Sequence, residues 1–377
     1  MKKVLSAFAV LTAASSLFAY NPPTGSEDLN RLSEPELLSG GHSSAGGALY
    51  FVTPSSIVNN PALPALEQRI MIDLGYTALI DSDDLSDDDY GNSAGLGVSI
   101  PSRYGVTTLL AQWIASPFLD MHLGHVFDFR GNFSKDITDN LNFGATANVG
   151  VAYDEKSDWK AGIDVGILYN FGKIAFMDDF RLGVALMNLG KPFSGDELFG
   201  MSADSRDENH EDWEDNEATM YPGLATLRVG VASTLFEAGL FKGGWSADVS
   251  VPTAQNAVFD AGFQVSYAEM VRLNVGWNAN LREMIEGRDV NLPSIGLSFK
   301  FAFQSSKLAA GNSDWGQSEM TVGAAWQQLY KNVTAVSGGA LLKLGTSDNE
   351  PPEITLWAED GKSDKKNDKS EKTESKE

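Results

Sequence analysis

The chain has 377 residues, 42% of them hydrophobic and 10% aromatic, so it is long enough to bury a large core. Its 51 acidic and 28 basic side chains leave a formal net charge of −23, which argues against binding nucleic acid through a basic patch. The chain contains no cysteine, which excludes a disulfide framework, a thiol nucleophile and a lipid-bearing cysteine.

Residues 1–19 have the pattern of a secretory signal peptide. A Met-Lys-Lys start precedes an apolar stretch, and the small residue Ala19 offers a cleavage point. Leu17 stands where a small residue is usual, so an uncleaved signal anchor is the alternative. The apolar stretch is shorter than a full membrane span, which favours cleavage and export. No later run of about 18 apolar residues follows, so we expect no membrane-spanning helix.

Residues 20–68 are rich in Gly, Ser, Pro and Asn and show no strong hydrophobic period. A disordered leader is one interpretation. The stretch nevertheless contains Leu49, Tyr50, Phe51 and Ile57, which are too apolar to be left in water. We therefore predict a compact plug that packs inside the next domain.

Residues 69–345 alternate between apolar and small or polar residues, as strands with one greasy face do. The strands run to about a dozen residues, longer than the usual five or six and long enough for a tilted strand to cross a bilayer. Trp159 at one end of a strand, with Tyr169 and Phe171 at the other, fits an aromatic girdle. The predicted strands are 69–80, 93–101, 105–115, 118–129, 141–153, 159–171, 179–189, 223–236, 244–252, 257–267, 270–281, 293–303, 318–330 and 334–345.

The connections alternate between short and long. The runs SRY, FSKDITDN and GKIAFMD are compact, whereas 81–92, 190–222 and 282–292 are longer or strongly charged. Short periplasmic turns and long outer loops are typical of outer-membrane barrels, so we expect the acidic loops to lie outside the cell. Residues 346–377 form a charged low-complexity tail that we expect to be disordered in the periplasm.

Several features of the leader and barrel match a known arrangement: Gly40, Gly41, Gly46, Gly47, Tyr50, Ser55 and the runs NPALPAL, LGVALMNLGKP and YPGLATLRVGVA. Together they resemble the FadL-type outer-membrane transporters and their PorV-like relatives. An Asn-Pro pair alone is a common turn signal, but here a glycine-rich leader precedes it and a long strand follows. The resemblance implies an all-β fold, a transmembrane antiparallel barrel of about 14 strands whose lumen is plugged by an N-terminal hatch. It also implies that Asn60, Pro61 and Ala62 gate the lumen.

The sequence predicts neither an enzyme nor a cofactor. It has no nucleophile elbow and no Walker loop, and only four histidines. His122 and His125 are three residues apart, which puts them on opposite faces of an unbulged strand and disfavours a shared metal. The acidic run 81–89 lacks the spacing of a calcium-binding EF-hand loop. We therefore assign no catalytic and no metal-ligating residues.

The inward positions of the clearest strands are mainly Gly, Ala, Ser, Thr and Asn, with Leu168 and Met187 added. In 105–115 both faces are apolar, so one set must face inward, and we predict that Leu109 and Trp113 bind ligand together with Leu168 and Met187. The alternative is that the plug simply packs there.

The predicted function is energy-independent diffusion of long-chain fatty acids or other hydrophobic small molecules through the outer membrane, whose lipids surround the barrel. The alternatives are a PorV-like surface scaffold or adhesin with a periplasmic or surface protein partner, and a general porin.

Overall fold

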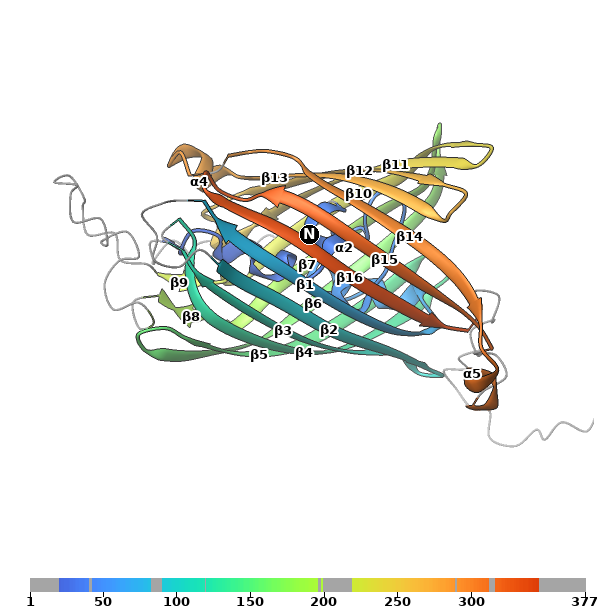
Figure 1. The fold of residues 1–377 in the computed structure, drawn as a ribbon, viewed down its shortest axis with the longest axis horizontal. Coiled ribbons are helices and arrows are strands. Elements are labelled where there is room, and N and C mark those ends of the chain that lie inside the picture. Colours follow the sequence, from blue (N-terminus) through green and yellow to red (C-terminus); the bar gives the residue numbers. More distant parts are fainter. Residues whose placement is uncertain are drawn as a thin grey trace, which may run out of the picture.

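Fourteen antiparallel strands close into a barrel in the computed structural model, which confirms the predicted fold class (Figure 1). The structure describes residues 20–345 apart from 41–42, 83–89, 119, 196–197, 199–218, 289 and 312–315. The predicted signal peptide, the predicted tail and most of the two acidic loops lie outside these residues. Among the described residues, no helix is long and apolar enough to cross a membrane.

Neighbouring strands follow one another in the chain, and β1 closes the barrel by pairing with β16. The small sheet of β8 (Phe193–Ser194) and β9 (Met220–Tyr221) lies in the connection between β7 and β10. The barrel strands are β1 (Ile70–Asp81), β2 (Tyr90–Ser102), β3 (Gly105–Pro117), β4 (His122–Thr138), β5 (Leu141–Tyr153), β6 (Ser157–Ile174), β7 (Met177–Lys191), β10 (Thr226–Ala238), β11 (Phe241–Val251), β12 (Val258–Tyr267), β13 (Val271–Asn280), β14 (Ser294–Gln304), β15 (Gln317–Gln328) and β16 (Val333–Leu344).

The largest error in the predicted strands concerns the fourth, expected at 118–129 and found at 122–138. The polar run FSKDITDN predicts a turn, but the structure extends the strand through most of it. Phe133 and Ile137 continue the outward face of β4, with 45% and 52% of their surfaces exposed, so the alternation goes on through the charged residues. The turn is confined to residues 139–140.

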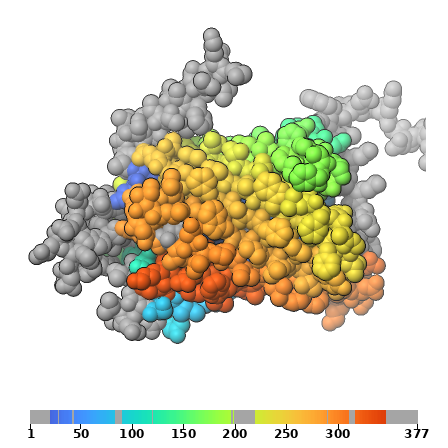
Figure 2. Space-filling view, turned by 90° about the horizontal axis from the view of Figure 1, so that it is seen from above, coloured from blue at the N-terminus to red at the C-terminus, as the bar shows by residue number. Residues whose placement is uncertain are grey.

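The outside of the barrel is an apolar belt. Residues in the middle of strands, such as Leu74, Leu96 and Val149, are 58%, 51% and 55% exposed. Exposed aromatic residues lie toward both strand ends, for example Trp159 at the start of β6 and Phe171 near its end. Figure 2 shows part of this wall from outside as a continuous surface of yellow to red strands. A belt flanked by aromatic girdles is typical of a barrel that faces lipid.

The two ends of the barrel differ, and we name them by their connections. The loop end carries the β1–β2 and β7–β10 connections and α4 (Leu281–Ile285). The turn end carries the two-residue connection between β4 and β5 and the longer β14–β15 connection with α5 (Ser306–Gly311).

The N-terminal segment, residues 20–68, runs through the barrel from the loop end to the turn end. The backbone N–H of Tyr20 donates to Gln255 Oε1 beside β11 at the loop end (3.0 Å), and Glu67 accepts from Lys343 Nζ at the turn end (2.8 Å). Between these points lie short helices: η1 (Ser26–Ser33), α2 (Pro35–Ser39), η2 (Pro54–Val58) and η3 (Leu63–Leu66). Figure 1 shows them in blue within the ring of strands.

Pro35, Pro54 and Pro64 of this segment each begin a short helix. Pro54 lies in the first turn of η2, whose start is closed by reciprocal hydrogen bonds between Thr53 and Ser56. Pro64 lies in the first turn of η3. Proline suits these positions because its ring fixes a helical φ and the first helical N–H has no intrahelical partner. Compact turns therefore replace long helices inside the lumen.

Replacing Leu74 by Arg tests whether the belt faces lipid. Leu74 lies in the middle of β1 with its side chain outward, so a charge there should lower the free energy of unfolding by about 2–4 kcal/mol. The same change at Tyr90, at the start of β2, should cost about 0–1 kcal/mol because it lies near the membrane surface. Denaturant titrations in lipid vesicles measure both values. Equal losses in the free energy of unfolding for the two variants would contradict the conclusion that the belt faces lipid.

Candidate functional site in the barrel lumen

The N-terminal segment reaches the barrel wall where the wall has glycine. A Cβ atom built on Gly183 would lie 2.0 Å from the carbonyl oxygen of Ser44, and one on Gly144 would lie 1.9 Å from that of Pro61. Real Cβ atoms essentially never approach an atom this closely. Glycine is therefore required at these wall positions, because the backbone of the N-terminal segment occupies the place of a side chain.

Four wall glycines form a row across the sheet. Gly323, Gly339, Gly75 and Gly95 are successive cross-strand partners in β15, β16, β1 and β2. Ser33 and Pro35 lie over the row: a Cβ on Gly75 would be 2.1 Å from Ser33 O, and one on Gly339 would be 2.8 Å from Pro35 Cδ. The row forms a flat seat for the junction between η1 and α2.

The Asn60-Pro61-Ala62 turn is fixed to β4 and β6 by hydrogen bonds. Asn60 is fully buried; its Nδ2 donates to the carbonyl oxygens of Ser44 and Ile167, both at 2.9 Å, and its Oδ1 accepts from Ala62 N at 2.9 Å. Asn132 of β4 donates to Pro61 O at 3.0 Å. The Asn60 side chain thus joins two parts of the N-terminal segment, Ser44 and the turn itself, to the barrel wall.

Two wall aspartates hold serines of the N-terminal segment in the same way. Asp248 Oδ2 accepts from the backbone N and the hydroxyl of Ser44 (2.7 and 2.6 Å), and Asp73 Oδ2 accepts from those of Ser55 (both 2.9 Å). Each aspartate lies against a glycine of the neighbouring strand, Gly230 or Gly97, where a Cβ would be 2.1 Å from the carboxylate. Charge-assisted hydrogen bonds of this kind are stronger than neutral ones.

The lumen contains more charged side chains than the alternating residue pattern predicts. Asp128, Arg130, Lys160 and Asp164 form a buried network, with Arg130 Nη2 and Lys160 Nζ lying 2.7 and 2.8 Å from Asp128 Oδ2. Lys160 reaches Asp128 over Gly150, the cross-strand partner of both, whose absent side chain leaves the space. The expectation that the inward positions are mainly small or uncharged polar residues is therefore wrong for β4 and β6, where pairing across strands neutralises the inward charges.

This network also touches the N-terminal segment. Arg130 Nη2 donates to Asn30 Oδ1 of η1 at 3.0 Å. Gln112 of β3 donates to Ser33 Oγ, with 2.5 Å between the two atoms, and to Asn30 O at 3.2 Å. The wall charges therefore position η1 as well as satisfying each other.

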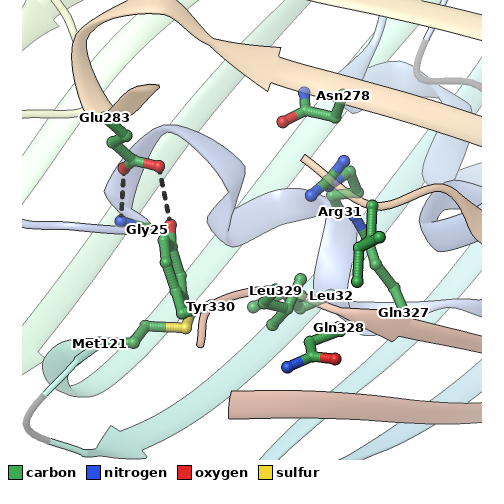
Figure 3. Close-up of a pocket in the computed structure, with 11 residues that line it drawn as sticks. Gly25, Arg31, Leu32, Met121, Asn278, Glu283, Gln327, Gln328, Leu329 and Tyr330 are labelled. Carbon is green, nitrogen blue, oxygen red and sulfur yellow. Dashed lines mark hydrogen bonds between the residues drawn. The ribbon is translucent and has the colours of Figure 1, made fainter. Parts of the chain in front are cut away.

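A small pocket lies at the loop end between η1 and the surrounding connections (Figure 3). Glu283 accepts from the backbone N of Gly25 (2.9 Å) and from the hydroxyl of Tyr330 (3.0 Å), which Figure 3 shows as dashed lines. Met121, Leu32 and Leu329 supply its apolar surface. Glu283 thus ties the start of the N-terminal segment to two loop-end connections.

Four cavities between the N-terminal segment and the wall have volumes of about 10, 20, 30 and 10 Å³. Each has room for about one or two water molecules, whereas an apolar cavity that binds benzene measures roughly 150 Å³. A hydrophobic molecule could enter these cavities only if the N-terminal segment moved.

The structure places the four predicted ligand-binding residues on two different faces. Leu168 and Met187 are buried and face the lumen, where Leu168 packs with Ala45, Ala62 and Leu63. Leu109 is 60% exposed on the outside of β3, and Trp113 lies on the same face, so the prediction that they line the lumen is wrong.

Two polar residues mark the inward face of β3, and the sequence prediction did not use them. Thr108 and Gln112 alternate with Leu110 and Ile114 on the inward face, and both polar side chains are buried. Because lipid cannot satisfy a polar side chain, Thr108 and Gln112 mark the inward set even though both faces contain apolar residues.

The histidines of β4 do not come together. His122 Nε2 lies 2.9 Å from Asp154 Oδ2, whereas the ring of His125 stacks on Tyr153 with 4.6 Å between centroids. In the described part of the chain, no three His, Asp or Glu side chains are grouped so that they could hold a metal ion.

An ion cluster joins the end of the N-terminal segment to the turn end of the barrel. Glu67 pairs with Arg69 and Lys343, both at 2.8 Å, and Arg69 pairs with Glu319 at 2.7 Å. Burial alone would raise the pKa of Glu67, but hydrogen bonds from Arg69 and Lys343 favour the carboxylate and lower its pKa to about 2. The cluster stabilises the folded state while Glu67 is charged.

No family model matches the chain, and no curated protein matches its sequence. Among solved structures, the toluene transporter TbuX of Ralstonia pickettii matches with a TM-score of 0.50 at 11% identity, over 85% of this chain and 100% of TbuX. The toluene transporter TodX of Pseudomonas putida matches with a TM-score of 0.47 at 9% identity, over 87% of this chain and 100% of TodX. At these identities the likeness is one of fold, and at that level it confirms the resemblance to FadL-type transporters.

Replacing Gly166 by Val tests the close approach of the wall to the Asn60 turn. A Cβ at Gly166 would lie 2.0 Å from Asn60 Oδ1, so the turn must leave its seat, and we expect a loss of about 1–3 kcal/mol in the free energy of unfolding. Gly131 of β4 faces outward, its Cβ position 3.8 Å from the nearest atom, and Gly131→Val is the matched control. Equal unfolding free energies for the two variants would contradict the close approach of the Asn60 turn to Gly166.

The Glu67 cluster predicts a specific sensitivity to acid. Because the pKa of Glu67 is lowered from 4.5 to about 2 on folding, its stabilising effect is complete above pH 4.5 and is lost as the pH falls toward 2. Glu67→Gln should lower stability at pH 7 and flatten its pH dependence in this window. Unfolding titrations at pH 7, 4.5 and 2.5 measure this, and an unchanged slope in the variant would contradict it.

Proposed function

We propose that the chain is an outer-membrane channel through which a hydrophobic or amphipathic small molecule diffuses, with the N-terminal segment acting as a movable hatch. The observation that carries this proposal is that the described residues close the lumen: a segment of short turns is held on wall glycines by hydrogen bonds, and the cavities beside it have room for only a few waters. The N-terminal segment can leave these glycines and return to them without unfolding any barrel strand.

The outer surface supports the cellular location. A closed barrel with an apolar belt satisfies its backbone hydrogen bonds internally and presents side chains that lipid solvates. In our proposal, residues 1–19 direct export and are removed after Ala19. The loop end then faces outside and the turn end faces the periplasm, as the short connections suggest.

The direction of passage follows from this orientation. Cargo enters at the loop end, where Glu283 and Tyr330 hold the start of the N-terminal segment, and leaves at the turn end. The Asn60-Pro61-Ala62 turn lies between, against Leu168, and its shift opens a path along β5 and β6. The toluene transporter TbuX shares the fold, which supports hydrophobic cargo in general. Long-chain fatty acids are the cargo we favour, because the lumen has both apolar and paired polar walls.

The two alternatives make different demands on the lumen. A general porin needs a water-filled channel, and the closed lumen disfavours it. A surface scaffold needs no passage at all, so the hatch would be a purely structural filling. Uptake measurements separate the scaffold from the channel.

Asn60→Ala is the most direct test of the hatch. The change leaves the carbonyls of Ser44 and Ile167 without their donor in a buried place, at a cost of about 1–3 kcal/mol. We expect uptake of labelled laurate by cells carrying the variant to change by at least threefold, and channel conductance in planar bilayers to rise.

The neighbouring Asn59 supplies the control. It is buried too, but its Oδ1 has no hydrogen-bond partner among the described residues, so Asn59→Ala should leave uptake and conductance near the wild-type values. Uptake that does not depend on the protein at all would overturn the channel and favour the scaffold. Uptake that depends on the protein but is the same in both variants would overturn the role of Asn60.

A further inference from the structure

Two guanidinium nitrogens of Arg272, at the turn end of the lumen, lack hydrogen-bond acceptors, although 19% of the side chain is exposed. Its Nε and Nη1 atoms are shielded from solvent and have no hydrogen-bond partner among the described residues. The nearest carboxylate, Glu36 of α2, lies 3.9 Å from Nη1, which is too long for a hydrogen bond. Glu36 Oε2 instead accepts from Asn274 Nδ2 at 3.0 Å.

The ring of Phe51 forms one side of this site. The guanidinium carbon of Arg272 lies 4.1 Å from the ring centroid, and Lys343 Nζ lies 5.4 Å from it. An arginine stacked on an aromatic ring keeps its donors in the plane of the guanidinium free for an anion. Phe51 belongs to the N-terminal segment, whereas Arg272 and Lys343 belong to the wall, so the site lies across the boundary between hatch and barrel.

Space for a ligand adjoins Phe51. Two of the cavities, of about 20 and 30 Å³, are both lined by Glu36, Phe51 and Thr53. Their volume matches one or two waters, so a larger group must displace a neighbour. Glu36 is the neighbour most easily displaced, because its contact with Arg272 is already long and an incoming anion would replace its charge.

We propose that Arg272 anchors a binding site for the anionic head group of an amphipathic molecule, with Phe51 as its apolar side and Lys343 as a second cation. The proposal rests on the proposed function, since the cargo must reach the turn end through the lumen. A carboxylate, sulfonate or phosphate would accept hydrogen bonds from Nε and Nη1 and take over the place of Glu36. Movement of Glu36 would loosen α2, so arrival of a head group would favour opening of the hatch at its exit.

The site therefore separates charged from neutral cargo. A neutral hydrocarbon offers no acceptor to Arg272, whereas an alkyl anion supplies both the acceptor and an apolar tail for Phe51 and the lumen. Equilibrium dialysis of the detergent-solubilised full chain with labelled octanoate, 1-octanol and acetate measures the three cases: tail with charge, tail alone and charge alone.

Arg272→Gln should weaken octanoate binding about tenfold or more, because a charge-assisted hydrogen bond is lost, and should leave 1-octanol binding within about twofold. Glu36→Gln should tighten octanoate binding, because the competing carboxylate is gone. Lys173→Gln is the matched control: it removes one positive charge at the turn end from a side chain that is 67% exposed, and should change neither ligand. Unchanged 1-octanol binding also shows that the Arg272 variant is folded.

Three results would overturn the inference. Equal loss of octanoate in the Arg272 and Lys173 variants would mean nonspecific attraction to positive charge, and acetate bound as tightly as octanoate would mean a small-anion site only. The third result is that the wild type binds 1-octanol but neither the Arg272 nor the Glu36 change alters octanoate binding. This result would contradict the head-group site but not the channel. Binding of neither tailed ligand by the wild type would overturn the proposed function itself.

Discussion

The close approach between the backbone of the N-terminal segment and the barrel wall is the contact on which the rest of the structure depends. It occurs where the wall has glycine, at Gly75, Gly144 and Gly183 among others, with distances that no side chain allows. Backbone groups inside a lumen must find hydrogen-bond partners. Because the wall is flat at the glycines, a segment made of short turns comes near enough to use carbonyls and side chains of the strands as those partners.

The charges of the lumen follow from the same geometry. Asp248 and Asp73 are close enough to accept two hydrogen bonds from one serine each because a glycine stands beside each carboxylate. Gly150 likewise lets Lys160 reach Asp128. Most of the buried charges are therefore paired, and the long contact between Arg272 and Glu36 stands out because it is not satisfied in this way.

The parts of the N-terminal segment are also joined to each other. Asn60 donates to Ser44 O, and Thr53 Oγ1 donates to Glu34 Oε2 at 3.3 Å. Burial, followed by the nearby Asp73 carboxylate, raises the pKa of Glu34 well above its usual value. These links mean that holding the segment at one point restrains its neighbours.

The strands could be predicted from the sequence alone, because an apolar alternation that continues for a dozen residues is typical of a strand that crosses a bilayer. The faces of β3 could not be assigned in this way, since Leu109 and Leu110 are equally apolar, although the polar Gln112 marked the inward set. The role of the glycines was also hidden, because Gly75 and Gly339 become neighbours only once the strand register is known. The network of Asp128 and Lys160 depends on residues that are paired through a third strand, which no local pattern reveals.

In the proposed mechanism, the N-terminal segment closes the lumen and must leave its glycine seat for cargo to pass. A Cβ on Gly95 would lie 3.0 Å from Ser33 Cβ, whereas disulfides have roughly 3.5–4.5 Å between these atoms, so Ser33→Cys with Gly95→Cys should form a bond once the two residues move slightly apart. The chain has no other cysteine to interfere. The measurement is laurate uptake by cells carrying this double variant, oxidised and then reduced. We expect uptake to be lost when the disulfide forms and to return on reduction. Equal uptake before and after reduction, with the disulfide shown to form in the oxidised sample, would contradict the movable hatch.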